Sequence, residues 1–335
     1  MLRWIFLLFL IHVEGSHVIK ISNQTSAQGH KKAVGSCPPA AGAGSGIADG
    51  DAFGNDFDTC MINRWTSSTA AGVPVLRTSP TASCRSATHT RLCYGISARR
   101  PNDAQYISCY DTARLIPHFT AQVVAYSKTI LPAYKRPSFS KDNGPCAPKP
   151  QSVPADISKP PTATGEYFCS RGHLTPSAAF ETKAERDVTF KMTNAAPQWQ
   201  VFNGGNWARV EEAVKNYVQT KKVDLYVFTG TTGTSTYVAP TVKTVIPKYY
   251  WKAVCDPGAK QSIFFVAENN VGNTSKNKVV SPSCFNKKMT EEKGVLECKS
   301  ISQAAGQYSQ VPDFHPGNCG TNKKGTFLKP YLNFT

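Results

Sequence analysis

Eleven cysteines constrain this chain more than any other feature of its sequence. They stand at positions 37, 60, 84, 93, 109, 146, 169, 255, 284, 298 and 319. No two of them form the C-x-x-C pair that zinc sites typically use, so disulfides are the better interpretation. Disulfides persist in oxidising compartments. We therefore predict four or five disulfides, in a connectivity that the sequence leaves open, with at least one and at most three cysteines left over because the number is odd.

The N-terminal residues 1–15 have the pattern of a secretory signal peptide. Arg3 supplies the positive charge, and residues 4–11 (WIFLLFLI) form an apolar run too short to span a bilayer. Val13 and Gly15 suit the positions before a cleavage site. No later apolar segment is long enough to span a membrane, so we expect an exported protein without a membrane span. Three N-x-S/T sequons predict N-glycosylation in that compartment, at Asn23, Asn273 and Asn333.

The charge balance is strongly basic. The chain has 38 Lys and Arg against 22 Asp and Glu, which gives a net charge of +16. Such an excess favours a polyanionic partner, either nucleic acid, an anionic membrane or an acidic glycan. The alternative is a basic exported protein whose charge has no binding role.

The pattern of the chain changes near residue 89. Residues 16–88 are rich in Gly, Ala, Ser and Thr and have weak periodicity, so we predict a small N-terminal extension tied by disulfides. Residues 89–335 carry the regular patterns and form the second predicted domain.

Strand and helix patterns alternate in this second part. Residues 106–128 predict a hairpin, with a turn at Asp111 and Thr112. Apolar residues at 207, 210, 214 and 218 predict a helix over 206–222. Further strands are predicted at 167–176, 187–194, 224–230, 246–256 and 261–269, and a further helix at 289–303. This order indicates an α+β fold with a mainly antiparallel sheet and flanking helices.

The segment SRGHLTP holds the first candidate for chemistry, His173. A lone histidine is more often structural than catalytic. Arg171 stands two residues earlier, so on a strand both side chains point to one face. An imidazole suits a general base, and a guanidinium on the same face suits a phosphate.

The segment FNGGNWARVEE holds the second group of candidates. Asn203, Trp207, Glu211 and Lys215 are spaced four residues apart, so they share one helical face if the helix begins by Asn203. Helix N-termini favour phosphate. The plainer interpretations are that Asn203 only caps the helix and that Glu211 lies on a solvated face.

Three motifs in order, RGHLTP, TNAAPQ (193–198) and FNGGNWARVE (202–211), resemble the DNA/RNA non-specific endonucleases with the ββα-metal fold. That family includes secreted bacterial nucleases, mitochondrial endonuclease G and secreted arthropod nucleases. The looser resemblance covers about residues 90–285. It implies that residues 89–335 form an endonuclease domain with the ββα-metal fold.

The resemblance also implies a role for each matching residue. His173 would be the general base that activates water, Asn203 the direct ligand of Mg²⁺, and Glu211 the holder of the metal's waters. Mn²⁺ would be a substitute cofactor. Arg171 and Arg136 would contact the scissile phosphate. Three further residues would support the site or bind substrate: Asn194, Gln198 and Lys215.

Two residues depart from the family pattern. Ser170 stands where the family often has Asp before Arg-Gly-His, and Lys215 stands where many members have Arg. Neither change removes the base or the metal ligand. We therefore expect a secreted, Mg²⁺-dependent endonuclease with little base preference. The alternative is an inactive extracellular protein that binds nucleic acid or other polyanions through the same basic surface. DNA and RNA both stay open as substrates, and so does the oligomeric state.

Overall fold

The computed structural model describes residues 50–63, 65, 74–96, 104–128, 134–158, 164–276, 278–280, 284–308, 310–320 and 327–335. The predicted signal peptide and Asn23 lie outside these residues. Contacts divide the chain into Met1–Ser36 and Cys37–Thr335, and every described residue belongs to the second unit.

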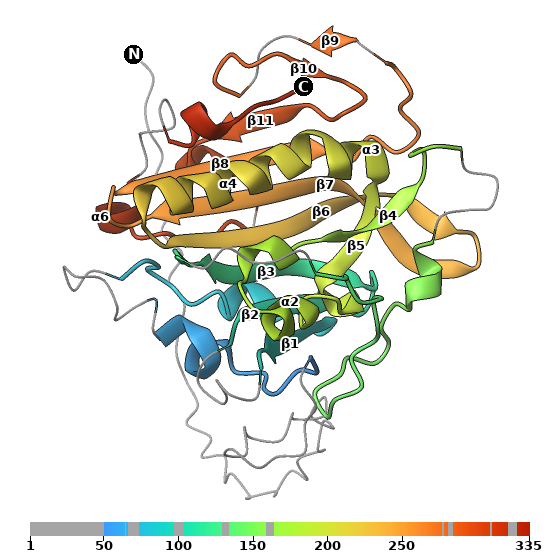
Figure 1. The fold of residues 1–335 in the computed structure, drawn as a ribbon. Helices are drawn as coiled ribbons and strands as arrows, with labels where there is room; N and C mark the ends of the chain where they lie inside the picture. Colours follow the sequence, from blue (N-terminus) through green and yellow to red (C-terminus); the bar gives the residue numbers. More distant parts are fainter. Residues whose placement is uncertain are drawn as a thin grey trace, which may run out of the picture. The chain divides into compact units, whose positions relative to one another are not determined.

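A seven-stranded sheet forms the centre of the described unit (Figure 1). Its strands are β1 (His89–Tyr94), β2 (Tyr106–Asp111), β3 (Ile116–Val124), β6 (Leu225–Ala239), β7 (Val242–Asp256), β8 (Gln261–Glu268) and β11 (Leu296–Lys299). They lie in the order β1-β2-β3-β6-β7-β8-β11, and every neighbouring pair is antiparallel. The predicted α+β class with a mainly antiparallel sheet is confirmed.

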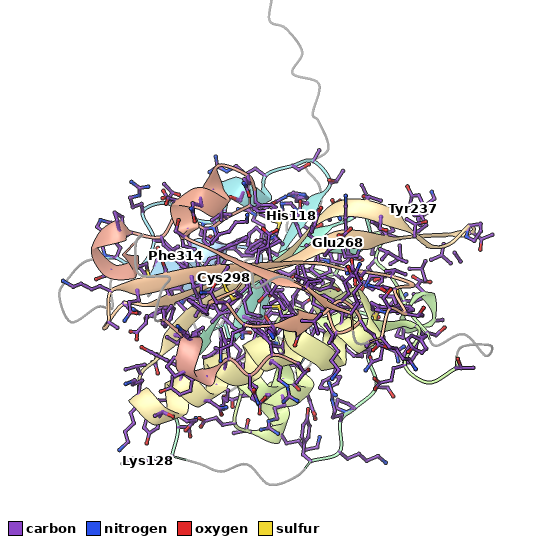
Figure 2. The ribbon with its side chains drawn as sticks, turned by 90° about the horizontal axis from the view of Figure 1, so that it is seen from above. His118, Lys128, Tyr237, Glu268, Cys298 and Phe314 are labelled. Carbon is purple, nitrogen blue, oxygen red and sulfur yellow. A yellow bond between two sulfur atoms is a disulfide. The ribbon has the colours of Figure 1, made fainter. Side chains whose placement is uncertain are left out.

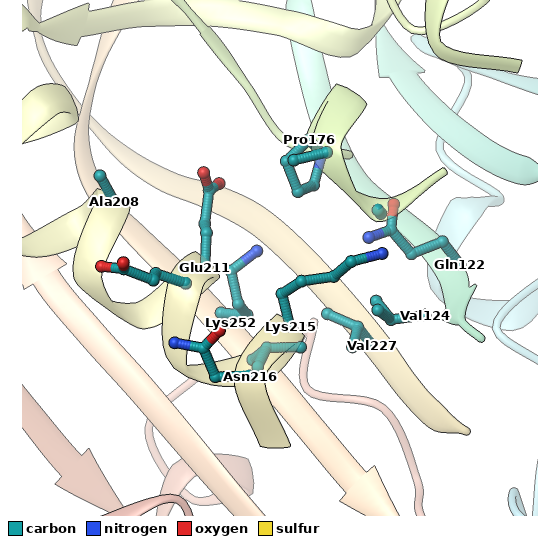
Figure 3. A pocket seen from close by; sticks show the side chains of 13 residues that line it. Gln122, Val124, Pro176, Ala208, Glu211, Lys215, Asn216, Val227 and Lys252 are labelled. Atoms are coloured by element: carbon teal, nitrogen blue, oxygen red, sulfur yellow. The ribbon is translucent and has the colours of Figure 1, made fainter. Parts of the chain in front are cut away.

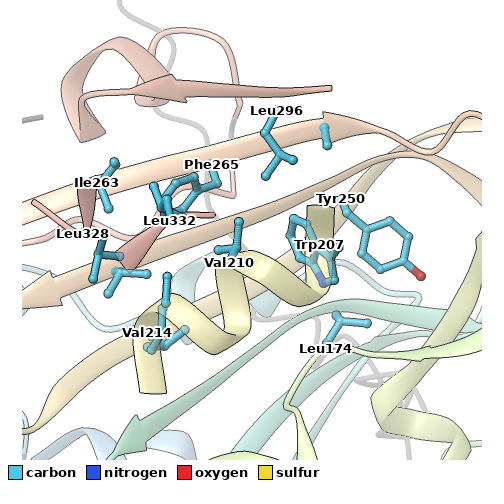
Figure 4. Close-up of a cluster of buried hydrophobic side chains, with 14 of the residues drawn as sticks. Leu174, Trp207, Val210, Val214, Tyr250, Ile263, Phe265, Leu296, Leu328 and Leu332 are labelled. Carbon is cyan, nitrogen blue, oxygen red and sulfur yellow. The ribbon is translucent and has the colours of Figure 1, made fainter. Parts of the chain in front are cut away.

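One face of the sheet is covered by helix α4 (Ala208–Lys221). Val210, Val214 and Val218 are buried there, as their helical spacing predicted. Figure 4 shows Trp207, Val210 and Val214 directed into the cluster that contains Ile263, Phe265 and Leu332. The helix ends where Lys222 adopts the left-handed conformation, at φ 56°.

The opposite face is covered by segments from both ends of the described chain. Phe57 and Trp65 pack there with Trp251 and Phe264 of the sheet, and Phe314 belongs to the same cluster. Short helices accompany this layer: η1 (Asp58–Ile62), η2 (Ala82–Cys84), α5 (Ile301–Ala305) and α6 (Pro316–Cys319). Because the sheet is covered on both faces, its central strands are apolar on both sides.

The β6–β7 pair extends beyond these two layers. Both strands are fifteen residues long. Tyr237 near the end of β6 is 55% exposed, and Figure 2 shows it at one end of the sheet. The end of β6 that holds Tyr237 therefore contributes little to the core.

A second, two-stranded sheet leads into α4. Strand β4 (Cys169–His173) pairs antiparallel with β5 (Ala195–Trp199). The short helices η5 (Ser177–Ala179), α2 (Lys183–Asp187) and η6 (Met192–Asn194) connect them. After β5 come α3 (Gln200–Phe202), the π-helical turn η7 (Asn203–Trp207) and α4. Strand, strand and helix thus follow in the order of a ββα unit.

Two element predictions are wrong. Residues 187–194 do not form a strand: the segment ends α2, turns, and enters η6. Val188, Phe190 and Met192 alternate because all three are buried, although the backbone is irregular. Residues 289–303 do not form a helix either, since they hold β10 (Met289–Thr290), β11 and the start of α5. The remaining short elements are η4 (Pro154–Asp156), β9 (Val279–Val280) and η8 (Lys329–Tyr331).

Disulfides join distant parts of the described chain. The pairs are Cys60–Cys93, Cys84–Cys109, Cys255–Cys319 and Cys284–Cys298. Cys146 is also disulfide-bonded. Among the described residues Cys169 is the free cysteine, and burial raises the pKa of its thiol to about 12. Within the same residues, no helix has the length and apolar character needed to cross a membrane.

Candidate active site

A cleft of about 680 Å³ lies between β4, the loop before η4 and the start of α4. It brings together five of the predicted site residues: Arg136, Arg171, His173, Asn203 and Glu211. Three others, Asn194, Gln198 and Lys215, do not line it. Residues more than 70 positions apart in sequence thus meet at one cavity.

His173 sits at the end of β4, where its ring packs in one cluster with two phenylalanines that also contact each other. The ring centroids of Phe139 and Phe190 each lie 4.7 Å from that of the imidazole. Burial lowers the pKa of His173 to about 3, and the charge of Arg136 acts in the same direction. Nε2 is buried and has no hydrogen-bond partner among the described residues, so Nδ1 is the nitrogen that can meet a water from the cleft.

The two arginines lie on the outer sides of these aromatic rings. The guanidinium of Arg136 is 5.2 Å from the centroid of Phe190, and that of Arg171 is 5.5 Å from the centroid of Phe139. Arg171 also donates to the carbonyl oxygen of Pro154 at 2.9 Å. This contact uses one N–H group of the guanidinium and leaves its other N–H groups to bind an anion.

Ser170 orients the amide of Asn203. Its hydroxyl donates to the carbonyl oxygen of Gln198 at 3.2 Å and accepts from Nδ2 of Asn203 at 3.0 Å. Because the nitrogen of the Asn203 amide is held in this way, the amide oxygen is the atom left for the cleft. The departure from the family's Asp therefore keeps a hydrogen-bond acceptor at this position.

The predicted row of Asn203, Trp207 and Glu211 is not one helical face. The backbone bends at Gly205, whose φ is −90° and ψ −124°. Trp207 is consequently fully buried in the core, while Asn203 and Glu211 line the cleft. A Cβ on Gly205 would lie 2.8 Å from the carbonyl oxygen of Lys293, so glycine permits this close approach.

Glu211 lies above a buried lysine. Lys252 of β7 is 1% exposed, donates to the hydroxyl of Thr229, and its ammonium lies 5.3 Å from the centroid of the Trp207 ring. Burial raises the pKa of Glu211, while Lys252 and Arg136 act in the opposite direction. Burial lowers the pKa of Lys252, and Glu211 opposes this shift. The two groups stabilise each other's charged forms.

Asn194 and Gln198 stand behind the cleft in β5 and its approach. Asn194 accepts from the backbone N–H of Thr175 and donates to the carbonyl oxygens of Thr175 and Thr189, all within 2.9 Å. It thereby holds the backbone that follows His173. Gln198 is fully buried against Gly172, where a Cβ would lie 2.2 Å from its amide oxygen. Its amide has no hydrogen-bond partner among the described residues.

The donor set of the cleft suits a hard divalent cation. It offers the free amide oxygen of Asn203 and the acceptor-only carboxylate of Glu211, with room for water. Mg²⁺ prefers oxygen ligands and retains several waters, so these residues fit it. A different trio, Cys84, His89 and Cys109, is close enough for a metal, but its two cysteines form a disulfide. That trio is therefore not a metal site.

Several residues of the site were not foreseen. Phe139 and Phe190 hold the imidazole, and Lys252 lies beneath Glu211. The sequence does offer a sign of Lys252, because this charged residue interrupts the apolar run of β7 between Trp251 and Ala253. No comparable signal separates the two phenylalanines from ordinary core residues.

Sequence comparisons find a family model and curated relatives that are similar to this chain. The family model for DNA/RNA non-specific endonucleases matches residues 83–307. The salivary endonuclease of Lutzomyia longipalpis is 36% identical over 112 residues, which are 31% of this chain and 27% of that protein. The salivary endonuclease of Culex quinquefasciatus is 31% identical over 113 residues, 32% of this chain and 31% of that protein. The chain thus spans less than a third of the length of the curated relatives it matches.

A solved structure is also similar. A chain of the EndoG/EndoGI complex aligns with a TM-score of 0.41 and 21% identity, covering 52% of this chain and 76% of that chain.

Proposed function

Because this chain belongs to the DNA/RNA non-specific endonuclease family, we propose that it is a secreted, Mg²⁺-dependent endonuclease. Its substrate would be the phosphodiester bonds of DNA, RNA or both, cut with little base preference. The observation that supports this most is the convergence of His173, Asn203 and Glu211 with two arginines on one cleft. A protein that only binds polyanions would need the arginines but neither an uncharged base nor a metal ligand.

His173 takes the proton from the attacking water in this proposal. Its lowered pKa keeps the imidazole uncharged near pH 7, which is the form that accepts a proton. Contact with Phe139 and Phe190 limits the rotation of the ring, so Nδ1 keeps one direction into the cleft. Positioning of this kind accounts for a large part of the rate enhancement in phosphoryl transfer.

Arg171 and Arg136 bind the scissile phosphate. Both guanidinium groups line the same cleft as His173 and carry a fixed positive charge. Their N–H groups can pair with the non-bridging oxygens and hold the phosphorus opposite the water.

Asn203 and Glu211 hold the metal. Asn203 contributes the amide oxygen as the direct ligand, and the carboxylate of Glu211 accepts hydrogen bonds from the metal's waters. A bound divalent ion stabilises the charge that builds on the phosphate and on the leaving 3′-oxygen. Mg²⁺ is the proposed ion and Mn²⁺ a substitute.

Secretion and glycosylation complete the proposal. Nine disulfide-bonded cysteines in the described chain, four pairs and Cys146, fit an oxidising compartment. Asn273 lies half-buried in a turn among exposed residues, and Asn333 is exposed, so both sequons are open to modification. The net charge of +16 would serve binding to the nucleic-acid backbone.

Activity against Mg²⁺ concentration tests the roles. Digestion of plasmid DNA and of RNA is measured with Mg²⁺ and with EDTA for the parent and three variants. His173→Ala should lower the rate about 10²–10⁴-fold at every Mg²⁺ concentration, because it removes the base. Asn203→Ala and Glu211→Ala should instead shift the Mg²⁺ requirement, about 10–100-fold for the water-holding Glu211, with partial recovery at high Mg²⁺.

Glu268→Ala is the matched control, since this carboxylate at the end of β8 is exposed and lines none of the cavities described in this chain. It should cut like the parent. Rescue of His173→Ala alone by excess Mg²⁺ would overturn the role assignment. A parent that degrades neither nucleic acid in Mg²⁺ would overturn the function.

A further inference from the structure

A second cavity, of about 300 Å³, opens from the cleft beyond Glu211. It lies between α4 and the strands β3 and β6, and it shares Pro176, Ala178, Ala208 and Glu211 with the cleft. Its volume is at the lower end of the range of about 300–1,000 Å³ that is typical of small-molecule sites. A group attached to the scissile phosphate can therefore enter it without leaving the cleft.

The walls of this cavity are mainly apolar. Seven of its thirteen lining residues are valine, alanine or proline. Figure 3 shows Val124 and Val227 on the side of the sheet and Pro176 on the opposite side. Burying a phosphate between such walls would cost far more than burying an uncharged ring, so the occupant is not a phosphate.

Gln122 gives the cavity an unpaired polar group. It stands on β3 directly opposite Val227 of β6 and two residues before Val124, and both valines belong to the core cluster. The residue is 2% exposed, and its amide oxygen is buried with no hydrogen-bond partner among the described residues. An unpaired buried amide oxygen destabilises the protein, and a ligand that donates a hydrogen bond to it would relieve that cost.

The amide of Gln122 matches the edge of a nucleobase. It offers one acceptor and two donors, and base edges present both kinds of group. Every base presents a donor or an acceptor that this amide can meet, so the contact is compatible with low base preference.

Lys215 supplies the charge next to this apolar space. Figure 3 shows its side chain extending across the cavity toward Gln122. An ammonium in that position can pair with a phosphate oxygen of the adjoining nucleotide. Lys252, at the base of the cavity, already donates to Thr229, and its positive charge interacts with Glu211.

We propose that this cavity is a nucleobase subsite, which rests on the nuclease function proposed above. The base of the nucleotide that flanks the scissile phosphate on the side of Glu211 enters between Val124, Val227 and Val214. Gln122 pairs with its edge, and Lys215 holds the next phosphate. Seating one base in this way fixes the position of the phosphate relative to His173.

Calorimetry with single nucleotides tests the subsite, because an endonuclease does not consume them. The parent protein in Mg²⁺ is titrated with deoxynucleoside 5′-monophosphates and with deoxyribose 5-phosphate, which lacks the base. We expect the nucleotides to bind about tenfold or more tightly. Gln122→Leu keeps the volume of the side chain and should reduce this ratio about 2- to 10-fold, the range of one hydrogen bond.

Gln105→Leu is the matched control. Gln105 is another buried glutamine with an unpaired amide, at 6% exposure, and it lines a different cavity. Its substitution should leave the ratio unchanged. Equal affinities for nucleotide and sugar phosphate in the parent, or equal effects of the two substitutions, would overturn the subsite.

A cleavage assay separates the two proposals. An abasic residue placed next to the cut should raise KM in the parent and have a smaller effect in Gln122→Leu. A parent that cuts DNA but ignores the abasic residue overturns the subsite and leaves the nuclease function intact. A parent that does not cut DNA or RNA overturns both.

Discussion

At His173 the decisive property is the absence of charge. The imidazole lies among phenylalanine rings and faces the positive charge of Arg136, so both burial and charge keep it unprotonated. Family resemblance identified the residue as a base. The packing explains how the imidazole stays uncharged and therefore able to accept a proton.

We expect protonation of His173 not to lower kcat/KM as pH falls through 6.5, where an ordinary imidazole gains its proton. The base works only when neutral, and a pKa lowered to about 3 postpones protonation to lower pH. The measurement is kcat/KM over roughly pH 4 to 8 at saturating Mg²⁺. Arg136→Ala should move the acid limb to higher pH. Burial raises the pKa of Glu211 to about 7, so its protonation can give an acid limb of its own. A half-maximal rate near pH 6.5 that persists in the residual activity of Glu211→Gln would contradict the prediction.

Ser170 gives the second prediction at this scale. Ser170→Ala removes the acceptor that holds Nδ2 of Asn203, so the amide is free to turn its nitrogen toward the metal. Apparent Mg²⁺ affinity should fall, by about 10–100-fold as for other residues that orient a metal ligand. Activity is titrated with Mg²⁺ for both proteins, with circular dichroism to compare folding. An unchanged Mg²⁺ requirement would mean that Asn203 is oriented without Ser170.

At the scale of elements, the turn η7 decides which side chains reach the cleft. A continuous helix from Asn203 would align Trp207 with Asn203 and Glu211. The bend at Gly205 turns Trp207 into the core instead. Asn206 secures this turn, because its side chain donates to the carbonyl oxygen of Gly294 at 2.7 Å.

The two glycines of this turn should respond differently to alanine. A Cβ on Gly205 would meet Lys293, so Gly205→Ala should destabilise the fold by about 1–3 kcal/mol. Gly204→Ala is the control: the nearest atom to its Cβ would be Nε2 of Gln200 at 3.5 Å, and the change should be within about 1 kcal/mol. Urea unfolding measures both. Equal free energies of unfolding for the two variants would show that the backbone at Lys293 can move to make room for the added methyl group.

At the scale of the whole molecule, the net charge of +16 predicts salt-sensitive binding. Each phosphate contact on duplex DNA contributes about −0.9 to the slope of log K against log salt. Binding of the His173→Ala variant to duplex DNA should therefore weaken steadily with salt. Arg136→Ala in that background should reduce the slope by about 1, equally for unrelated sequences. A flat response would exclude the basic surface as the binding footprint.

The amino-acid pattern alone predicts the fold class, most of the strands and the helix 206–222. Those elements follow from local periodicity, since alternation and helical spacing reflect which faces are buried. It also indicated His173, Asn203 and Glu211 through ordered motifs. Local patterns failed at residues 187–194, where burial of alternate residues imitates a strand although the backbone turns.

The groups that surround the candidate base and the candidate ligand follow from the folded chain and from no local pattern. Phe139 lies 34 residues before His173 and Phe190 lies 17 after it, and no periodicity connects them. Gln122 and Lys252 lie on strands that antiparallel pairing brings beneath α4, so their burial depends on sheet register and helix packing. The chemistry of a side chain depends on the dielectric and the charges around it, and residues distant in sequence supply both.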